Sequence, residues 1–269
     1  MRDYRLGISA YYHDSAAALV ADGIVVAAAQ EERFTRRRHD SSFPASAIRY
    51  CLAEAKIKLS DLASVIYYED PALKFRRTLS SFCSAGPRGA PAFIRLLPEW
   101  LGHKRNALSQ INAGLAAMDL GQAPAAQCVP HHLSHAASAF YPSPFDQAAV
   151  LCIDGVGEWH STTIWRGDGD HLDLVNSISY PHSIGLLYSA FTAFCGFKVD
   201  SGEYKLMGLA PYGEPVYADL IKDRYIHLRS DGSYSLDLSQ FEFLWGERMV
   251  GAAFERQFGS ARRPEAPSR

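Results

Sequence analysis

Two stretches of the chain share one alternation of short apolar runs and polar turns. Near the N-terminus, the turn "HDSA" and an Asp22-Gly23 hairpin separate three runs that predict strands: "YRLGISAYY", "AAALVA" and "IVVAAAQEERF". From residue 148 the pattern recurs, with the turn "GVGE" and a hairpin at Asp168-Gly169, in "AAVLCID", "STTIWRG" and "HLDLVNSISY". We therefore predict two three-stranded meanders.

The similar spacing of the two meanders favours an α/β fold with two related lobes, in which the first turn of each meander can face a shared cleft. We place the first lobe at about residues 1–145 and the start of the second at about 146–258. Residues 259–269 form a polar, proline-rich tail. The alternative is two unrelated meanders, because Asp-Gly hairpins are common.

Between and after the meanders, apolar residues recur at helical spacing. This spacing predicts helices over residues 45–55, 110–118, 131–140 and 184–194. A buried strand is predicted in "LASVIYYE", and a further hairpin in "YIHLRSDGSYSLDL". Residues 74–112 are expected to form an irregular, partly helical insertion. The glycine-rich segment "DSGEYKLMGLAPYGEP" is expected to form a loop.

Composition limits the classes of function open to this chain of 269 residues. Its net charge of −2 argues against a nucleic-acid binder that works by bulk electrostatics. The basic run "RFTRRRH" is either a phosphate contact or a solvated loop. Five scattered cysteines without a C-x-x-C pair indicate a reducing compartment. Without an apolar signal segment or a run of membrane length, we expect a cytoplasmic protein that contacts no membrane.

The segment "VPHHLSHAASAF" is a candidate metal-binding helix. It places His131 and His135 one turn apart, so that both side chains project from one face. Two such imidazoles can bind one divalent ion, but the general-base glutamate of the H-E-x-x-H motif is missing. Neutral imidazole suits iron or zinc, and a carboxylate fits as a third ligand. The alternative is a pair of ordinary surface or core histidines.

Asp154 ends the first strand of the second meander and precedes the turn "GVG". Its carboxylate is expected at the carboxyl end of the strand, where α/β folds bind ligands. Gly155 and Gly157 would leave their backbone N–H groups free to approach an anionic part of the substrate. A plain acidic β-turn is the alternative.

Two further residues are candidates for contact with a substrate. His13 lies at the position in the first meander that corresponds to Asp154, where it could bind phosphate or transfer protons. Lys205 lies on a glycine-rich loop, from which it could contact a phosphate or carbamoyl oxygen. The P-loop and Rossmann glycine motifs are absent from the sequence. An exposed turn histidine and a turn-rich connector remain the alternatives.

Five segments together, and in this order, resemble the NodU/CmcH-type O-carbamoyltransferases, which modify nodulation factors and antibiotics: "GISAYYHDSAAALV", "EERFTRRRHDSSFP", "HHLSHAASAFYPSPF", "IDGVGEW" and "SGEYKLMGLAPYG". The catalytic domain of that family is similar to Kae1, in the actin/Hsp70/sugar-kinase superfamily. The duplicated lobes of that superfamily agree with the doubled meander.

The resemblance implies a two-step reaction. A YrdC-like domain uses ATP and carbamoyl phosphate to make carbamoyl adenylate, and a Kae1-like domain transfers the carbamoyl group to a hydroxyl, usually on a sugar. The resemblance also implies a divalent metal, Fe²⁺, held by His131, His135 and Asp154. It further implies that His13 lines the transfer site, where it is our candidate general base, and that Lys205 lies near the donor.

Members of the family are much longer than this chain. We therefore expect the N-terminal portion of a Kae1-like domain, with the second lobe truncated and the YrdC-like domain absent. The expected partners are a complementary C-terminal chain and a small-molecule or sugar hydroxyl acceptor, without nucleic acid. A homodimer is one possible assembly.

Three hypotheses about function follow. The chain is part of an O-carbamoyltransferase, a non-catalytic remnant that retains metal or partner binding, or a Kae1-like protein that modifies tRNA or binds nucleotides. The "GEYKLMGLAPYG" block and the absence of a basic surface weigh against the tRNA version. A neighbouring reading frame that encodes the missing part would distinguish the first hypothesis from the second.

Overall fold

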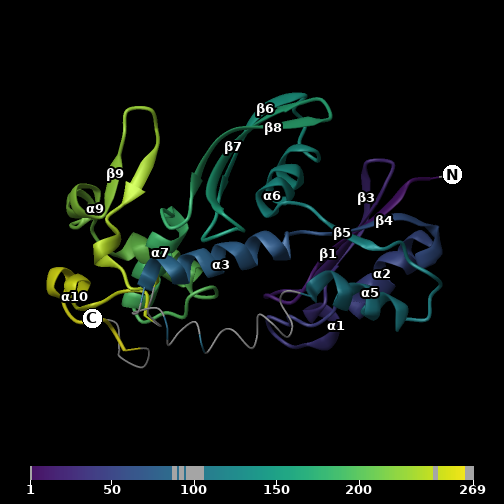
Figure 1. Cartoon of the computed structure of the whole chain (residues 1–269), viewed down its shortest axis with the longest axis horizontal. Helices are drawn as coiled ribbons and strands as arrows, with labels where there is room; N and C mark the ends of the chain where they lie inside the picture. The colour runs from purple at the N-terminus through teal and green to yellow at the C-terminus, as the bar shows by residue number, and fades with distance from the viewer. Residues whose placement is uncertain (1, 87–89, 91–93, 95–105, 245–247, 264–269) are drawn as a thin grey trace. The chain divides into compact units, whose positions relative to one another are not determined.

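The computed structural model describes residues 2–86, 90, 94, 106–244 and 248–263 (Figure 1). The chain divides into two compact units: unit 1 comprises Met1–Phe75 and Leu97–Ser134, and unit 2 comprises Arg76–Leu96 and His135–Arg269. The divisions fall inside helix α3 (Pro71–Ala85) and helix α6 (His131–Phe140). The expected lobe boundary near residue 145 stays a prediction.

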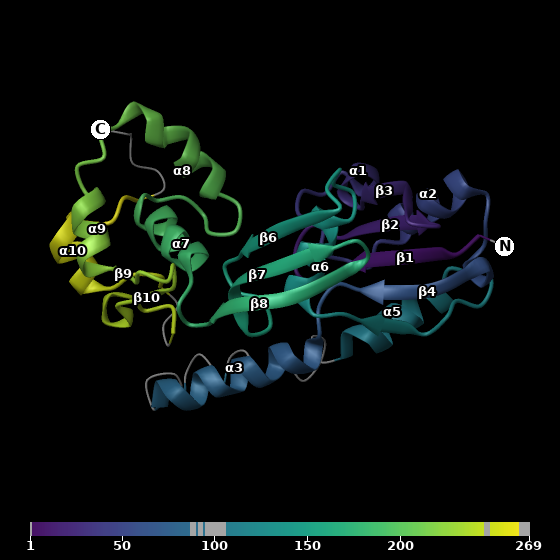
Figure 2. The same cartoon turned by 90° about the horizontal axis from the view of Figure 1, so that it is seen from above.

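Unit 1 is built on a mixed five-stranded sheet with the strand order β3-β2-β1-β4-β5 (Figure 2). The strands are β1 (Tyr4–Ser9), β2 (Ala16–Ala21), β3 (Ile24–Gln30), β4 (Leu62–Tyr67) and β5 (Ala126–Cys128). The first three form the predicted antiparallel meander. The strands β4 and β5 extend the sheet in parallel with β1. This arrangement is an α/β fold with a mixed sheet.

Two helices cover one face of this sheet, α2 (Ala45–Ala55) and α5 (Ala107–Ala116). Leu6 and Leu19, which are paired across β1 and β2, belong to the same fully buried cluster as Ile48 of α2 and Ile111 of α5. The short 3₁₀ helix η1 (Leu59–Asp61) leads into β4. The bounds predicted for α2 are confirmed. The prediction succeeded because the apolar residues of this helix recur at helical spacing and face the core.

The third strand is shorter than predicted. The apolar run was expected to continue through Phe34, but β3 ends at Gln30 and helix α1 (Glu32–Thr35) follows. The reason is Glu31, which is 3% exposed and accepts hydrogen bonds from the backbone N–H groups of Ser46 (3.1 Å) and Ala47 (2.8 Å). A carboxylate that satisfies the first N–H groups of α2 therefore turns the chain inward at this point.

Unit 2 begins with the second meander, a three-stranded antiparallel sheet of β6 (Gln147–Ile153), β7 (His160–Asp168) and β8 (His171–Ser179). Helix α6 packs on this sheet through Phe140, whose ring lies directly over Gly167 of β7. Both predicted meanders are thus present, each with its Asp-Gly hairpin. The relatedness of the two lobes stays a prediction.

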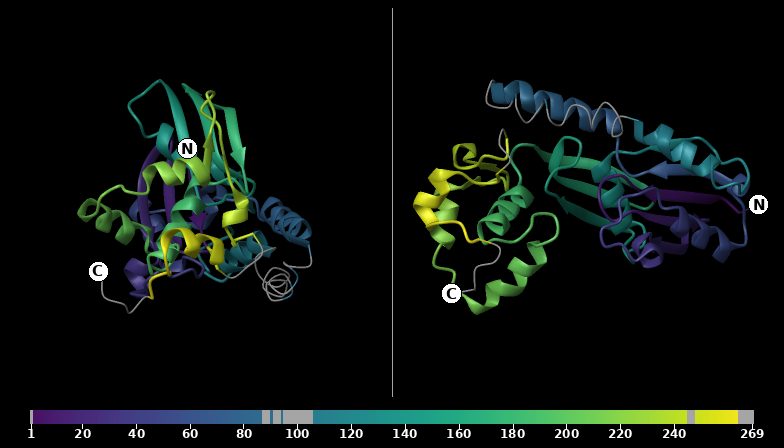
Figure 3. Two further views of the ribbon diagram at one scale, coloured as in Figure 1. Left: turned by 90° about the vertical axis from the view of Figure 1, so that its left-hand side faces the viewer. Right: turned by 90° about the horizontal axis from the view of Figure 1, so that it is seen from below.

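The rest of unit 2 is organised around a cluster of aromatic rings. Figure 3 shows the ribbon of this part of the chain, coloured from green to yellow. Helix α7 (Ile184–Phe194) contributes Phe191, and α10 (Ala252–Phe258) contributes Phe254, whose ring centroid lies 5.0 Å from that of Phe191. Tyr225 and Phe241 complete the buried centre. The elements between α7 and α10 are α8 (Glu203–Leu209), η4 (Ala210–Tyr212), α9 (Ala218–Arg224), β9 (Ile226–Leu228), β10 (Tyr234–Leu236) and η5 (Leu238–Gln240). The predicted bounds of α7 and the hairpin of β9 and β10 are confirmed.

The insertion expected over residues 74–112 is helical where it is described. Helix α3 continues to Ala85, and α5 begins at Ala107. Residues 87–89, 91–93 and 95–105 lie outside the described part of the chain. Among the described residues, no helix has both the length and the apolar character needed to cross a membrane.

The contact between Gly167 and Phe140 provides a test of packing in unit 2. A Cβ atom on Gly167 would lie 2.5 Å from the Phe140 ring, whereas a Cβ on Gly208 of α8 would meet nothing within 4 Å. We expect Gly167→Ala to lower the free energy of unfolding by about 1–3 kcal/mol through overpacking. Gly208→Ala should raise it by up to about 1 kcal/mol, because alanine favours the helix. Urea denaturation followed by circular dichroism measures both, and equal effects would contradict the contact.

Candidate metal centre

Helix α6 carries the two histidines that the sequence analysis placed on one face. The helix spans His131–Phe140, as predicted, and Pro130 precedes it, a residue that suits a helix start. Ser134 Oγ donates a hydrogen bond to the carbonyl of Tyr68 (2.9 Å), which ties the first turn of α6 to the end of β4. His132, the middle histidine of "HHLSH", is 2% exposed and belongs to the interior.

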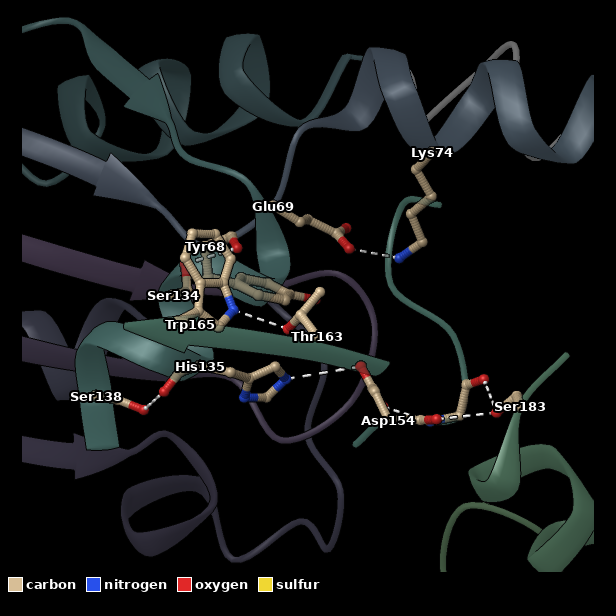
Figure 4. Close-up of polar contacts among 11 residues, drawn as sticks. Tyr68, Glu69, Lys74, Ser134, His135, Ser138, Asp154, Thr163, Trp165 and Ser183 are labelled. Carbon is tan, nitrogen blue, oxygen red and sulfur yellow. Dashed lines mark hydrogen bonds and ion pairs between the residues drawn. The ribbon is translucent and has the colours of Figure 1, made fainter. Parts of the chain in front are cut away.

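The side chain of Asp154 approaches the same helix. Its Oδ2 lies 3.6 Å from Nε2 of His135, and Figure 4 shows the two groups directed toward each other. One ligand atom from each of His131, His135 and Asp154 can be chosen so that all three lie within 4.8 Å of one another. The His135 side chain is 50% exposed and that of Asp154 29% exposed, so an ion could reach them from solvent.

These three residues fit a divalent transition metal. Such ions hold imidazole nitrogens and carboxylate oxygens at about 2.0–2.2 Å, so two ligand atoms on one ion lie at most about 4.4 Å apart. The observed limit of 4.8 Å is close enough for small side-chain rotations to bring all three atoms onto one ion. Two neutral imidazoles and one carboxylate suit iron, and three ligands leave coordination positions for a substrate.

The turn that carries Asp154 is held by the beginning of helix α7. Ser183, the N-cap of α7, accepts a hydrogen bond from the N–H of Leu186 (3.0 Å). Its hydroxyl also lies within donor distance of the carbonyls of Asp154 (3.0 Å) and Gly155 (2.7 Å) (Figure 4). In addition, Asp154 N–H donates to Ser161 O (2.9 Å) across the first turn of the meander. The main chain at Asp154 is therefore fixed from two sides.

Gly185 allows this close approach between the turn and α7. A Cβ atom at this position would lie 2.5 Å from the carbonyl oxygen of Asp154 and 2.6 Å from the nitrogen of Gly155. Backbone atoms cannot move aside as the end of a flexible side chain can. A glycine is therefore required at residue 185 for Asp154 to remain where it is.

The expectation for the glycines after Asp154 is wrong in one respect. The N–H of Gly155 donates to Asp154 Oδ1 (2.7 Å), and the N–H of Gly157 donates to His160 O (3.0 Å). Both groups are engaged within the turn, because a short β-turn satisfies its own backbone donors first. They are thus not free to bind an anion in this conformation, and substrate binding by these glycines stays a prediction.

The structure places His13 in unit 1, in the turn between β1 and β2. Its Nδ1 lies 2.9 Å from Oδ2 of Asp14, and Nδ1 of His39 lies 2.9 Å from the other oxygen of the same carboxylate. Burial alone acts to raise the pKa of Asp14, but the hydrogen bonds and charges of His39 and His13 outweigh it and lower that pKa. His13 therefore belongs to a polar cluster in unit 1 that also contains Asp14 and His39.

The expectation that Lys205 lies on a loop is wrong, because Lys205 lies on helix α8. Glu203, in the first turn of α8, accepts hydrogen bonds from the N–H groups of Asp200 (3.0 Å) and Gly202 (3.1 Å) and from Ser189 Oγ (2.9 Å). These bonds organise the helix start, and the residues that follow, "YKLM", favour a helix. Lys205 itself is exposed, with its Nζ 5.9 Å from the centre of the Tyr204 ring.

Four residues of these sites were not assigned a role from the sequence. Ser183 and Gly185 fix the Asp154 turn, and the serine before an apolar helical run was a usable N-cap signal. Asp14 and His39 join His13, and the signal for them was a repeated tripeptide, because His-Asp-Ser occurs at residues 13–15 and again at 39–41. The close approach at Gly185 had no signal in the sequence.

Comparison with known proteins shows the family of the chain. The chain belongs to the family described as "Carbamoyltransferase N-terminus", which it matches over residues 4–268. It is 52% identical over 268 residues to the uncharacterized protein sll1178 of Synechocystis sp., and this match covers 97% of the chain and 43% of the relative.

Two rhizobial proteins are also similar to the chain. Nodulation protein NolNO of Sinorhizobium fredii is 33% identical over 86% of the chain and 32% of its own length. Nodulation protein NolO of Bradyrhizobium diazoefficiens is 38% identical over 41% of the chain and 20% of its own length. These proteins support the predicted NodU-type carbamoyltransferase family, which is thereby confirmed. The chain spans less than half the length of each of these three relatives.

Among solved structures, YeaZ from Pseudomonas aeruginosa aligns with the chain at a TM-score of 0.33 and 14% identity, over 66% of this chain and 68% of YeaZ. A likeness at this level supports no conclusion about this protein.

The metal-ligand prediction can be checked by removing both imidazoles of α6. We expect His131→Ala combined with His135→Ala to abolish binding of Fe²⁺ or Mn²⁺, because the remaining carboxylate of Asp154 is a single ligand. Elemental analysis after anaerobic loading and gel filtration measures the bound metal. The matched control is His171→Ala, at a histidine whose side chain is 79% exposed. Unchanged metal content in the double variant would refute the ligand assignment.

The start of α8 predicts a dependence of stability on pH. Burial acts to raise the pKa of Glu203, but the hydrogen bonds from Asp200, Ser189 and Gly202 lower it below its ordinary value of 4.5. A lowered folded-state pKa stabilises the fold above the ordinary value, and this stabilisation is lost as the pH falls through the folded pKa. We expect Glu203→Gln to lower the free energy of unfolding at pH 7 by about 1–3 kcal/mol.

The difference between the wild type and Glu203→Gln should shrink as the pH falls below about 4.5, because the carboxylate of the unfolded wild type then becomes protonated while that of the folded protein stays ionised to a lower pH. Urea denaturation at a series of pH values measures this difference. A difference that stays constant between pH 7 and pH 3.5 would contradict the role of the ionised carboxylate.

Proposed function

We propose that the chain supplies the metal-binding and transfer portion of an O-carbamoyltransferase. The observation that carries the proposal is the cluster of His131, His135 and Asp154 in a chain that belongs to the "Carbamoyltransferase N-terminus" family. The acceptor is a hydroxyl, which we propose lies on a sugar-containing natural product or nodulation factor. The similarity to the nodulation proteins NolNO and NolO supports the nodulation factor as one case.

In this proposal His131, His135 and Asp154 hold a divalent metal, which we propose is Fe²⁺. When bound, the metal would supply Lewis acidity that stabilises negative charge on the leaving group of the donor. The residues around Asp154 position this ligand. The bonds of Ser183 and the close approach at Gly185 fix the main chain at Asp154, and the N–H of Gly155 donates to the carboxylate, so that little reorganisation is needed when the donor binds.

The proposed donor is carbamoyl adenylate, made from ATP and carbamoyl phosphate. The acceptor oxygen forms a bond to the carbamoyl carbon, the bond from that carbon to the phosphate oxygen breaks, and AMP leaves. His13 takes the proton of the acceptor hydroxyl as general base. Its side chain is 49% exposed, which leaves it open to an acceptor. Lys205, also exposed, is proposed to contact the donor phosphate, with Gly155 and Gly157 as further contacts.

We propose further that the fold is Kae1-like, with two related lobes. The two antiparallel meanders with Asp-Gly hairpins support the relation of the lobes. The proposed partner is a complementary C-terminal chain, because the matched relatives extend far beyond the shared region. That partner would bring the adenylate-forming domain.

A non-catalytic remnant that still binds metal is the competing function. The metal cluster favours neither function, because both retain it. The hydrogen bonds that hold the Asp154 turn serve metal binding in either case, so carbamoyl transfer is the measurement that separates the two functions. For the alternative of a Kae1-like tRNA-modifying or nucleotide-binding protein, the residues that the structure describes offer no supporting observation.

Carbamoyl transfer tests the proposal. We expect the chain alone to give no carbamoylated product from ATP, carbamoyl phosphate and a panel of aminoglycosides and lipo-chitooligosaccharides. Addition of the C-terminal part of the Synechocystis relative as a separate polypeptide should restore transfer, measured by mass spectrometry as the mass of one carbamoyl group. Robust turnover by the chain alone would refute the need for a partner, and no turnover in the mixture would favour the remnant.

A further inference from the structure

The two His-Asp-Ser tripeptides of the sequence lie side by side in unit 1. Ser15 N–H donates to Asp40 O (2.8 Å), and Tyr11 N–H donates to Ser41 O (2.9 Å), so the turn after β1 is pinned to the segment after α1. Across this junction, His39 of the second tripeptide reaches Asp14 of the first. The repeated sequence thus produces a cluster in which two imidazoles share one carboxylate.

The shared carboxylate sets which nitrogen of each imidazole carries the proton. The two oxygens of Asp14 each lie 2.9 Å from one Nδ1 atom, of His13 and of His39 respectively. The pKa of Asp14 is lowered by these contacts, so its carboxylate stays ionised and can only accept hydrogen bonds. Both Nδ1 atoms must therefore donate. In a neutral imidazole the other nitrogen, Nε2, is then without a proton and can accept one.

The backbone holds this cluster in conformations that cost energy. Asp14 and His39 both take left-handed angles, with φ of 51° and 56°. The N–H of His39 donates to Glu32 Oε2 (3.0 Å), and the side chain of Asp40 accepts hydrogen bonds from Thr35 Oγ1 (2.8 Å) and Ser42 Oγ (2.6 Å). Strain of this kind persists where the surroundings enforce it, and it is concentrated at functional sites.

An aromatic ring and three charged side chains lie around the cluster of His13, Asp14 and His39. The centre of the Tyr12 ring lies 4.5 Å from that of the His13 ring, with the two rings tilted by 46°, and Lys74 Nζ lies 4.6 Å from the centre of the Tyr12 ring. Lys74 is paired in turn with Glu69 (2.7 Å). Glu32 faces the backbone of His39. Asp14 is the carboxylate in direct contact with both imidazole rings, so the proton positions depend on it first.

We propose that Asp14 and His39 are positioning residues for His13. Asp14 holds His13 in the tautomer with the proton on Nδ1 and stabilises the imidazolium that forms when Nε2 accepts a proton. His39 holds the second oxygen of Asp14, so that the carboxylate cannot rotate away. The inference rests on the proposed function, in which His13 accepts the proton of the acceptor hydroxyl.

The tautomers of His13 and His39 can be measured without an assay of carbamoyl transfer. In protein labelled with ¹⁵N-histidine, long-range ¹H–¹⁵N spectra at about pH 8.5, where imidazoles are neutral, show which ring nitrogen carries the proton. His13→Gln and His39→Gln assign the two signals among the ten histidines. We expect both rings to be protonated on Nδ1. A ring of His13 protonated on Nε2, or an even mixture of tautomers, overturns the inference.

Asp14→Asn is the decisive variant. Asparagine tolerates the left-handed backbone angle of this position, so the turn should keep its conformation. Its amide accepts a hydrogen bond on one side only and donates on the other. One of the two imidazoles must then move its proton to Nε2, and that change in the spectrum is the expected result. Unchanged tautomers of both His13 and His39 in this variant overturn the inference.

An exposed pair in unit 2 provides the matched control. Asp170 Oδ1 lies 3.2 Å from His171 Nε2, and these side chains are 92% and 79% exposed. Asp170→Asn makes the same chemical change beside a histidine, but it should leave the signals of His13 and His39 as in the wild type. If the His13 or His39 signals change in Asp170→Asn, the spectrum does not report the contact with Asp14 specifically, and the inference fails.

Activity then separates this inference from the proposed function. In the mixture with the C-terminal polypeptide, Asp14→Asn should lower kcat by about 10²–10⁴-fold with little change in KM, because a base in the wrong tautomer cannot accept the proton. His39→Gln should lower kcat less, by about tenfold. If the tautomers change as expected but kcat does not, His13 is not the base and the proposed function fails at that step. If the tautomers do not change, the positioning inference fails whatever the activity.

Discussion

The close contact between the Asp154 turn and the first residues of α7 is the constraint on which the candidate metal centre depends. Gly185 lets backbone meet backbone there, and the Ser183 hydroxyl lies between the N–H of Leu186 and the carbonyls of Asp154 and Gly155. A carboxylate at the end of a strand would otherwise be free to turn into solvent. Held in this way, it faces His135 at 3.6 Å.

In unit 1 the turn that carries the candidate residues is held in place by different contacts. The turn after β1 is also the first turn of a meander, and it also carries the residues proposed for chemistry. It is held by the segment after α1, through the backbone bonds of Tyr11 and Ser15 and through the shared carboxylate of Asp14. In both units a segment distant in the sequence holds a strand-end turn that carries candidate side chains: the start of α7 in unit 2 and the segment after α1 in unit 1. Such support gives a site its precision.

Much of the fold could be predicted from patterns within short windows. The bounds of α2, α6 and α7 followed from apolar residues at helical spacing, and both meanders followed from apolar runs with Asp-Gly turns. Two errors fell where a single side chain overrides the local pattern. Glu31 ends β3 because it binds the start of α2, and Glu203 starts α8 inside a segment whose glycines suggested a loop.

The sequence by itself determined the presence of the two meanders and their Asp-Gly turns, the one-turn spacing of His131 and His135 and the family to which the chain belongs. These features depend on neighbours a few residues apart or on motifs read in order. Only the tertiary structure decided that Asp154 faces His135, that α7 requires a glycine at residue 185, and that His13 and His39 share Asp14. Those contacts join residues distant in the chain, and their geometry exists only once the sheets and helices have packed.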